Sequence, residues 1–566
     1  MGYNDDAGSR GKKISIIVIS TIVLVGMVGS ITYTTIHKSD PSEQPELQGG
    51  QVYSSNKGVQ SVCAPTQYKK TCEESLASAN TTDPKELIKV AFQYAEKSIG
   101  DVISKSALIQ EAGKDPRTKG ALDVCKVVLN DAIEDFKRSS SKVGEFDVTK
   151  LESYLDDLKT WLSGTVTYQE TCIDAFENTT SNAGERMKAL LKTTSELASN
   201  SIAMVSGLSD IVSQLTFTKS TRRLLLQQSD DIPSFVDDET RRVLFAQGTT
   251  LAPNAIVSAT GKGQFKTINE AINSIPKGNN QTFIIFVRAG VYNEYVVIPK
   301  RVNKVVLIGE GPTKTKITGN KNYADGTNTF NTATVAVNGD YFLARDIGFE
   351  NSAGAEKHQA VALRVSGDYA VFYNCQMDGY QDTLYVHTYR QFYRDCTITG
   401  TIDFVFGDAA AIFQNCKFIV RKPMETQNCM VTAQGRKDPL SVGVIVLQKC
   451  QILAEPAYIA AKLATKNYLG RPWKEFSRTI IMNSVIDGFI DPEGWAPWMG
   501  TFALETLYYG EYQNTGPGAN TAQRVTWKGI QKITPQIAES FTPGKYFRND
   551  SFITTYRIPY VAGMMP

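Results

Sequence analysis

The second half of this chain repeats chemically similar residues at an almost constant spacing. Asp382 and Asp403 lie 21 residues apart, and the late cysteines follow one another at 20 or 21 residues in two groups: Cys375, Cys396 and Cys416, then Cys429 and Cys450. Between them run short segments rich in β-branched residues, punctuated by Gly, Asn and Asp. Such a period is typical of a parallel β-solenoid, in which residues one coil apart stack on neighbouring strands. A β-sandwich, with turns about every 8–12 residues, is the alternative and explains less of the pattern.

The two aspartates could do chemistry together in such a fold. On adjoining coils they would lie roughly 4.8 Å apart along the stack. Two carboxylates this close cannot both ionise cheaply, so one keeps its proton near neutral pH. The pair would supply a neutral acid and an ionised nucleophile or base, in a chain with only three histidines. The alternative interpretation is that both are ordinary turn residues.

Polar neighbours favour the catalytic interpretation. Gln381 precedes Asp382, and Gln359 lies 22 residues before Gln381. Both amides could therefore donate to a developing oxyanion from adjoining coils. Arg471 could grip a carboxylate and Trp473 could stack on a sugar, although packing of an Arg-Pro-Trp turn is the alternative.

The N-terminal region predicts a membrane segment. Residues 14–36 carry no charge, and Arg10, Lys12 and Lys13 precede them. The run is long enough to span a bilayer, with the tail 1–13 in the cytosol. A cleaved signal peptide is the rival interpretation. Either way, we expect most of the chain to be lumenal or extracellular.

Beyond this segment the pattern changes three times. Residues 37–60 are polar and resemble a spacer, whereas residues 61–218 show helical periodicity and predict an antiparallel all-α bundle. Residues 219–249 form a linker that is either an ordinary charged connection or a processing site for a protease. Its two dibasic steps are at Arg222, Arg223, Arg241 and Arg242.

Charge and cysteines add two expectations. The net charge is +2, but residues 250–566 contain 32 Lys and Arg against 25 Asp and Glu, or +7, which leaves −5 for the first 249 residues. A basic second half could favour a polyanionic partner, although ordinary scatter explains it equally well. With no CxxC pair and few histidines, the cysteines indicate disulfides in an oxidising compartment, with one thiol left over. Candidate glycosylation sites are Asn80, Asn178, Asn280 and Asn549.

Five motifs, in order, resemble those of plant pectin methylesterases (pectinesterases). They are GVYNE at 290–294, QAVALR at 359–364, QDTL at 381–384, DFVFG at 403–407 and LGRPW at 469–473. The resemblance covers residues 250 to about 550. The four-cysteine region before it resembles the pectin methylesterase inhibitor family.

This resemblance implies a right-handed parallel β-helix over residues 250–555 that demethylates pectin, preceded by an inhibitor-like four-helix bundle. It implies that Asp403 is the nucleophile, Asp382 the proton donor and Gln381 the oxyanion donor, helped by Gln359, with no metal or cofactor. Arg471, Trp473 and Thr329 are implied substrate contacts. The implied disulfides are Cys63–Cys72, Cys125–Cys172 and Cys396–Cys416, although coil spacing equally allows Cys375 to pair with Cys396.

Two positions depart from the family pattern. Asp408 follows the DFVFG motif where many relatives carry asparagine, and we expect a modest effect on the pH optimum. Cys429 is unusual and is our candidate for the unpaired thiol. A polygalacturonase, a pectate lyase and an inert binding protein are the rival functions, whereas a serine esterase is excluded by the absence of a GxSxG motif.

The expected partners follow from the same reasoning. They are methyl-esterified pectin, a subtilase-like processing protease and inhibitor-type proteins, with no nucleic acid and a monomeric chain. We expect a membrane-anchored precursor that is delivered to the cell wall. The helical region is expected to keep the esterase silent until the linker is cut, because a tethered inhibitor faces its target at high effective concentration.

Overall fold

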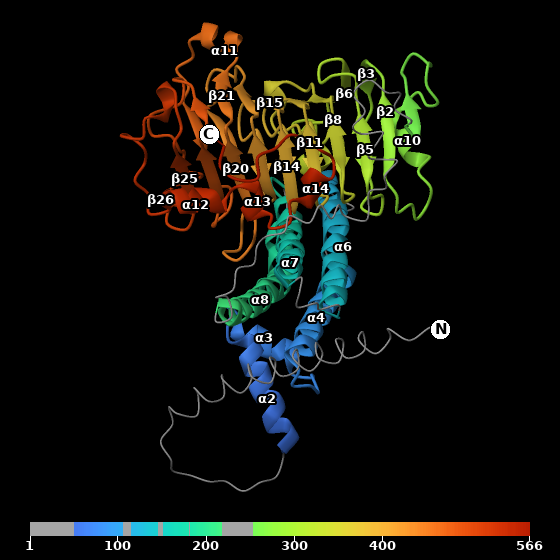
Figure 1. Ribbon diagram of the computed structural model, residues 1–566, viewed down its shortest axis with the longest axis vertical. Coiled ribbons are helices and arrows are strands. Elements are labelled where there is room, and N and C mark those ends of the chain that lie inside the picture. The colour runs from blue at the N-terminus through green and yellow to red at the C-terminus, as the bar shows by residue number, and fades with distance from the viewer. Residues whose placement is uncertain (1–49, 106–114, 145–150, 180–181, 218–252, 566) are drawn as a thin grey trace, which may run out of the picture.

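The computed structural model describes residues 50–105, 115–144, 151–179, 182–217 and 253–565 (Figure 1). They form a helical unit before residue 218 and a β-helix after residue 252. The predicted membrane segment 14–36 and the four linker arginines lie outside the described residues. Within the described ranges, no helix has both the length and the apolar character needed to cross a membrane.

The helical unit is a bundle of four long helices with two shorter ones at its N-terminal end. The long helices are α4 (Pro84–Lys105), α6 (Pro116–Gly144), α7 (Leu151–Asp174) and α8 (Ala183–Phe217); the shorter ones are α2 (Gly50–Cys63) and α3 (Lys69–Leu76). Apolar residues at helical spacing form the core, as in α4, where Leu87, Ala91 and Phe92 are at most 2% exposed. The predicted bundle is confirmed. Helix α2, however, begins inside the predicted spacer 37–60.

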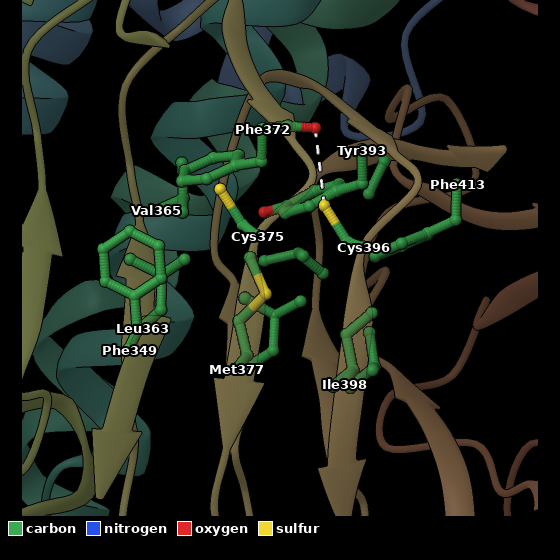
Figure 2. Close-up of a cluster of buried hydrophobic side chains, with 14 of the residues drawn as sticks. Phe349, Leu363, Val365, Phe372, Cys375, Met377, Tyr393, Cys396, Ile398 and Phe413 are labelled. Atoms are coloured by element: carbon green, nitrogen blue, oxygen red, sulfur yellow. Dashed lines mark hydrogen bonds between the residues drawn. The ribbon is translucent and has the colours of Figure 1, made fainter. Parts of the chain in front are cut away.

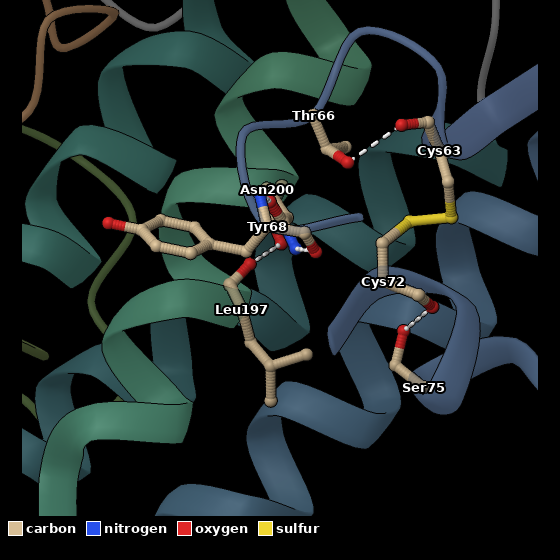
Figure 3. The surroundings of a disulfide bond; sticks show 8 residues. Cys63, Thr66, Tyr68, Cys72, Ser75, Leu197 and Asn200 are labelled. Carbon is tan, nitrogen blue, oxygen red and sulfur yellow. Dashed lines mark hydrogen bonds between the residues drawn. A yellow bond between two sulfur atoms is a disulfide. The ribbon is translucent and has the colours of Figure 1, made fainter. Parts of the chain in front are cut away.

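Two disulfides join neighbouring helices of this unit, and both were predicted. Cys63–Cys72 links the end of α2 to α3 (Figure 3), and Cys125–Cys172 links α6 to α7. Beside the first, Asn200 of α8 bonds the backbone of Tyr68 through both its amide oxygen and its amide nitrogen. The short helices are thereby held against the bundle.

Three sheets form the β-helix. The 11-stranded sheet contains, in spatial order, β1 (Ala255–Val257), β2 (Phe283–Val287), β5 (Val305–Ile308), β8 (Leu343–Arg345), β11 (Ala370–Tyr373), β14 (Arg390–Arg394), β17 (Ala410–Gln414), β20 (Val444–Gln448), β23 (Arg478–Met482), β25 (Tyr508–Tyr512) and β26 (Ile530–Lys532). The 7-stranded sheet contains β22 (Asn467–Gly470), β19 (Cys429–Gln434), β16 (Val405–Gly407), β13 (Leu384–Val386), β10 (Leu363–Val365), β7 (Val335–Val337) and β4 (Val296–Ile298). The 8-stranded sheet contains β24 (Val485–Ile486), β21 (Gln451–Ala454), β18 (Lys417–Val420), β15 (Thr397–Gly400), β12 (Gln376–Asp378), β9 (Gly348–Asn351), β6 (Thr315–Gly319) and β3 (Gly290–Asn293).

Short helices decorate these coils: α10 (Ile268–Asn273), α11 (Pro456–Ala461), α12 (Pro535–Ser540), α13 (Pro543–Tyr546) and α14 (Ser551–Thr554), with 3-10 turns at Thr329–Asn331, Ala355–Lys357 and Pro517–Ala519. The neighbouring strands pair in parallel. Leu384 of β13 lies opposite Val405 of β16, which is the register that the spacing of the two aspartates predicts. The predicted parallel β-helix is confirmed.

The late cysteines contradict two expectations, a disulfide at Cys396 and a single unpaired thiol in the chain. Cys375, Cys396, Cys416, Cys429 and Cys450 are all free and buried, so the predicted disulfide between Cys396 and Cys416 is wrong. Figure 2 shows Cys375 and Cys396 side by side in the core, at matching positions of adjoining coils. Side chains stacked in this way stand about 4.8 Å apart, farther than the roughly 3.8 Å that a disulfide needs between its Cβ atoms.

The spacing from Cys429 to Cys450 is also not one coil. Cys429 begins β19 in the 7-stranded sheet, where it lies opposite Asn467. Cys450 instead precedes β21 in the 8-stranded sheet, and Gln451 lies opposite Lys417. The coil after Cys416 is thus longer than the two coils directly before it, and its added residues made the interval from Cys429 to Cys450 match the period by coincidence.

Helices cover two outer faces of the β-helix (Figure 1). The 11-stranded sheet packs its outer apolar residues against α12, α13 and α14. The 7-stranded sheet packs against the helical unit, and one apolar cluster joins the bundle core to Tyr385, Tyr389 and Phe406. The second contact covers the face on which the predicted site residues lie.

Candidate active site

One cavity of about 200 Å³ collects every residue predicted for catalysis or substrate binding. It lies on the 7-stranded sheet and is lined by Thr329, Gln359, Gln381, Asp382, Asp403, Arg471 and Trp473. The two aspartates precede β13 and β16, and Arg471 follows β22. These residues are far apart in the sequence, but adjoining coils of the β-helix bring their corners side by side.

Both aspartates sit at strained corners of the backbone. Asp382 has φ of 63° and Asp403 has φ of 51°, in the left-handed region that non-glycine residues rarely adopt. The backbone N–H of Asp382 donates to Ile402 O at 3.0 Å, and this hydrogen bond joins the two neighbouring corners. Strain of this kind is tolerated where the surrounding structure fixes a functional side chain.

Arg471 binds the carboxylate of Asp403 through two of its nitrogens. Its Nε donates to Asp403 Oδ1 at 2.9 Å, and its Nη2 donates to Oδ2 at 2.5 Å. Burial raises the pKa of Asp403, and the charge and hydrogen bonds of Arg471 act against this increase. The guanidinium also lies 4.3 Å above the ring of Trp498. The contacts with Arg471 therefore favour the ionised form of Asp403.

Asp382 has the opposite environment. It is 8% exposed. Burial, followed by the charge of Asp403, raises the pKa of Asp382 well above its usual value, while Arg471 opposes the rise more weakly. The cavity therefore combines an ionised carboxylate with a neighbouring carboxylic acid, as the spacing of the two residues predicted.

Two glutamines occupy matching positions on adjoining coils. Gln359 and Gln381 form an isolated parallel bridge, and the N–H of Ala360 donates to Gln381 O at 3.1 Å. Both side chains are half-buried and line the cavity. Their amides can donate hydrogen bonds into the same space, beside the two aspartates.

The helical unit completes the wall of this cavity. Thr171, Asp174, Ala175 and Glu177, at the end of α7 and just beyond it, line the cavity opposite the aspartates. Thr171 Oγ1 also lies 2.8 Å from Nε2 of His387. That histidine is fully buried, and burial lowers its pKa well below the usual value, which indicates a structural role.

Sequence reasoning missed several residues that line the cavity: Tyr323, Asn328, Phe330, Tyr385, Phe406, Ala433 and Trp498. Tyr385 and Phe406 lie opposite each other on adjoining coils. They share the sequence interval of the two aspartates, and this shared interval could have identified them. Tyr323, Asn328 and Trp498 belong to loops, which carry no periodic signal.

The two departures from the family pattern lie outside this cavity. Asp408 accepts hydrogen bonds from Thr167 Oγ1 at 2.8 Å and Gln434 Nε2 at 3.1 Å. Burial raises its pKa to about 7, so its negative charge is only partly present near neutral pH. Cys429 is a buried free thiol, and burial raises its pKa to about 12.

The remaining predicted positions are on the surface. The four candidate glycosylation asparagines are exposed, although Asn178 Nδ2 also donates to the hydroxyl of Tyr323 at 2.9 Å. No group of three or more metal-ligating side chains is found in the part of the chain that the structure describes.

Known proteins similar to this chain account for both of its parts. A family described as "Pectinesterase" matches residues 254–550, and one described as "Plant invertase/pectin methylesterase inhibitor" matches residues 57–204. "Putative pectinesterase/pectinesterase inhibitor 28" of Arabidopsis thaliana is 48% identical over 566 residues, which is 100% of this chain and 76% of the relative. A "Pectinesterase" of Petunia integrifolia is 57% identical over 382 residues, 67% of this chain and 100% of the relative.

A solved structure aligns with the β-helix. "Pectin methylesterase from Carrot" is 48% identical, with a TM-score of 0.55, and covers 56% of this chain and 100% of its own. The carrot chain therefore corresponds over its whole length to a part of this chain about as long as the β-helix. The solved carrot chain is thus a folded structure of about the length of the β-helix alone.

Proposed function

This chain belongs to the pectinesterase family, and we propose that Asp382 and Asp403 carry out its hydrolysis of pectin methyl esters. The substrate is methyl-esterified galacturonan, and the products are methanol and a free carboxylate. The observation that carries the mechanism is the bidentate contact of Arg471 with Asp403 beside a buried Asp382. The contact favours an ionised nucleophile, and the burial favours a neutral acid.

The first half of the reaction forms an acyl-enzyme. An oxygen of Asp403 attacks the ester carbonyl carbon, and the developing oxyanion accepts hydrogen bonds from Gln381 and Gln359. The carbon–oxygen bond to the methoxy group then breaks. Asp382 gives its proton to this leaving group, which departs as methanol.

The second half restores the enzyme. Asp382, now ionised, takes a proton from water as the water oxygen attacks the acyl carbon. The bond to Asp403 breaks, and Asp403 leaves as a carboxylate while the galacturonate acid is released. Arg471 also fixes Asp403 in position, and Trp473 offers an aromatic face for a sugar ring.

The test is methanol release from methylated pectin by residues 250–566 and by the same unit carrying Asp403→Asn. The amide fills the same space but cannot attack, so we expect a loss of roughly 10⁴–10⁶ in turnover without unfolding. Release of methanol at the unaltered rate from a folded variant would show that Asp403 is not the nucleophile. New unsaturated chain ends would instead indicate a lyase.

The helical unit is proposed to inhibit the esterase until the linker is cut. The position of Asp174, Ala175 and Glu177 against the cavity supports this role, since a sugar chain and α7 cannot occupy that space together. Processing by a subtilase-like protease at Arg222, Arg223, Arg241 or Arg242 belongs to the same proposal. Binding by separate inhibitor-type proteins would follow from the same covering of the cleft.

Delivery to the cell wall, with a membrane-anchored and glycosylated precursor, is also proposed. The two disulfides of the helical unit support passage through an oxidising compartment. Exposure of the asparagines in all four candidate glycosylation motifs is compatible with modification there. Action as a monomer on the wall polysaccharide stays a prediction.

A further inference from the structure

Lys474 directly follows Trp473 in the sequence, and its ammonium group forms ion pairs with the helical unit. Its Nζ lies 2.6 Å from Asp174 Oδ1 and 3.3 Å from Glu170 Oε2, both on α7. Its side chain is 13% exposed. Among the described residues, these are its only ion pairs. Removal of α7 would leave the ammonium group of Lys474 without these two carboxylate partners, beside the cleft.

The cavity around Lys474 continues the active-site cavity. It has a volume of about 300 Å³, and Trp473, Trp498 and Asp174 line both spaces. Lys474 Nζ also lies 5.2 Å from the ring centroid of Trp473. A polysaccharide that presents an ester to Asp403 and extends past Trp473 therefore brings its next sugar towards Lys474.

A second lysine of this cavity, Lys437, differs from Lys474 in its ion-pair partners. Lys437 Nζ lies 2.6 Å from Glu475 Oε1 of the β-helix and 4.0 Å from Glu170 of α7. Its charge is thus already balanced within the β-helix. Lys474 has no ion pair with a described residue of the β-helix, so its charge is available to an anionic ligand once α7 is removed.

The chain that follows α7 contacts further donors of the cleft through its backbone carbonyls. Asn328 Nδ2 donates to Ala175 O at 2.8 Å, and the Tyr323 hydroxyl donates to Glu177 O at 3.3 Å. The end of α7 thus offers carboxylates to a cation and carbonyl oxygens to neutral donors. A galacturonan chain offers the same two kinds of acceptor.

We propose that Lys474 binds the free carboxylate of a galacturonate residue next to the ester being hydrolysed, and that Asp174 and Glu170 occupy this subsite in the intact chain. Asn328 and Tyr323 bind the uncharged oxygens of the same polysaccharide. The inference rests on the proposed esterase function and deepens it. The preferred substrate is pectin in which free and methylated residues are neighbours.

The test uses residues 250–566 carrying Lys474→Gln, with two substrates of equal length: fully methylated and partly demethylated oligogalacturonate. A charge-assisted hydrogen bond to a carboxylate is lost only with the second substrate. We expect kcat/KM for the partly demethylated substrate to fall about 10- to 100-fold, through KM, and that for the fully methylated one to stay within about twofold. Lys474→Arg should retain most of the preference.

Lys417→Gln is the matched control, because this exposed lysine lies on β18 in the 8-stranded sheet. Equal losses on both substrates, or no loss on either, would overturn the assignment of Lys474. These outcomes differ from failure of the proposed function, in which the unaltered unit releases methanol from neither substrate.

Discussion

Two sets of helices cover the β-helix, and the chemistry of the two contacts is different. The C-terminal helices α12, α13 and α14 bring apolar side chains, including Phe541, Phe547 and Phe552, against the outer face of the 11-stranded sheet. Helices α6 and α7 bring apolar side chains to Tyr385, Tyr389 and Phe406, but they also bring many carboxylates to cations of the β-helix. The resulting ion pairs include Lys300 with Asp131 and Asp135, Arg301 with Glu134, Arg390 with Asp156 and Asp157, and Lys474 with Glu170 and Asp174.

The C-terminal contact resembles a permanent interface, whereas the contact with the helical unit, which includes several ion pairs, resembles one that can separate. Arg390 illustrates why separation is feasible. It pairs with Asp156 and Asp157 of α7, but its Nη2 also lies 2.6 Å from Asp368 of the β-helix. The buried guanidinium therefore keeps a partner after α7 leaves. We therefore expect the C-terminal helices to stabilise the fold, whereas the helical unit is proposed to control access to the active site.

The largest effect is expected in the C-terminal contact. Phe552 is 1% exposed and its ring centroid lies 5.1 Å from that of Tyr369. Phe552→Ala should lower the free energy of unfolding of residues 250–566 by about 3–5 kcal/mol. Urea denaturation measures this. Ile459→Ala, at a residue that is 59% exposed, is the control and should change little. Equal effects of the two substitutions would show that the C-terminal contact does not stabilise the fold.

The next effect concerns the face under the helical unit, which carries the proposed reacting groups. Gln381→Ala should lower kcat by about 10²–10³ with a smaller change in KM, because one oxyanion donor is lost. Methanol release by residues 250–566 gives both constants. If only KM changed, Gln381 would bind the ground state of the substrate instead.

A smaller effect is expected from a substitution that weakens only the contact between the helical unit and the β-helix. The Tyr389 hydroxyl donates to Asp135 Oδ2 at 2.6 Å, across the junction between β-helix and α6. Tyr389→Phe leaves this buried carboxylate short of a donor, which costs about 1–3 kcal/mol. The uncut chain should then release methanol roughly tenfold faster, while residues 250–566 carrying the same change should keep their rate. A change in both would place Tyr389 in the catalytic unit.

The last effect is a change in pH dependence. Activity requires ionised Asp403 and protonated Asp382, so it should rise with pH through the pKa of Asp403 and fall through that of Asp382. Arg471 lowers the pKa of both carboxyl groups. Arg471→Gln should therefore move both limbs of the pH profile of kcat to higher pH, whereas Arg471→Lys should move them less. Unmoved limbs would contradict the proposed charge states.

The sequence predicted the features that repeat with the coil. The constant interval predicted that Asp382 and Asp403 lie on adjoining coils, and the strands that follow them have this register. The same argument failed for Cys429 and Cys450, because an inserted loop lengthened one coil. The disulfide at Cys396 came from the family resemblance, and the stacking distance of about 4.8 Å between adjoining coils is too long for it.

The contacts between the two units had no periodic signal. The charge difference between the halves of the chain did not show that Asp174 would reach Lys474 or that Thr167 would bond Asp408. Tyr323 and Trp498 enter the cavity from loops, whose paths depend on tertiary packing. Residues of this kind require the structure.

The central claim is that the helical unit closes the cleft of an otherwise complete esterase. Methanol release should be compared between residues 250–566 and a full chain that carries alanine at Arg222, Arg223, Arg241 and Arg242 to keep it uncut. Because the tether raises the effective concentration of the inhibitor, the uncut chain should be slower by about 10²–10⁴-fold on the same pectin. Equal rates from the two proteins would contradict the account.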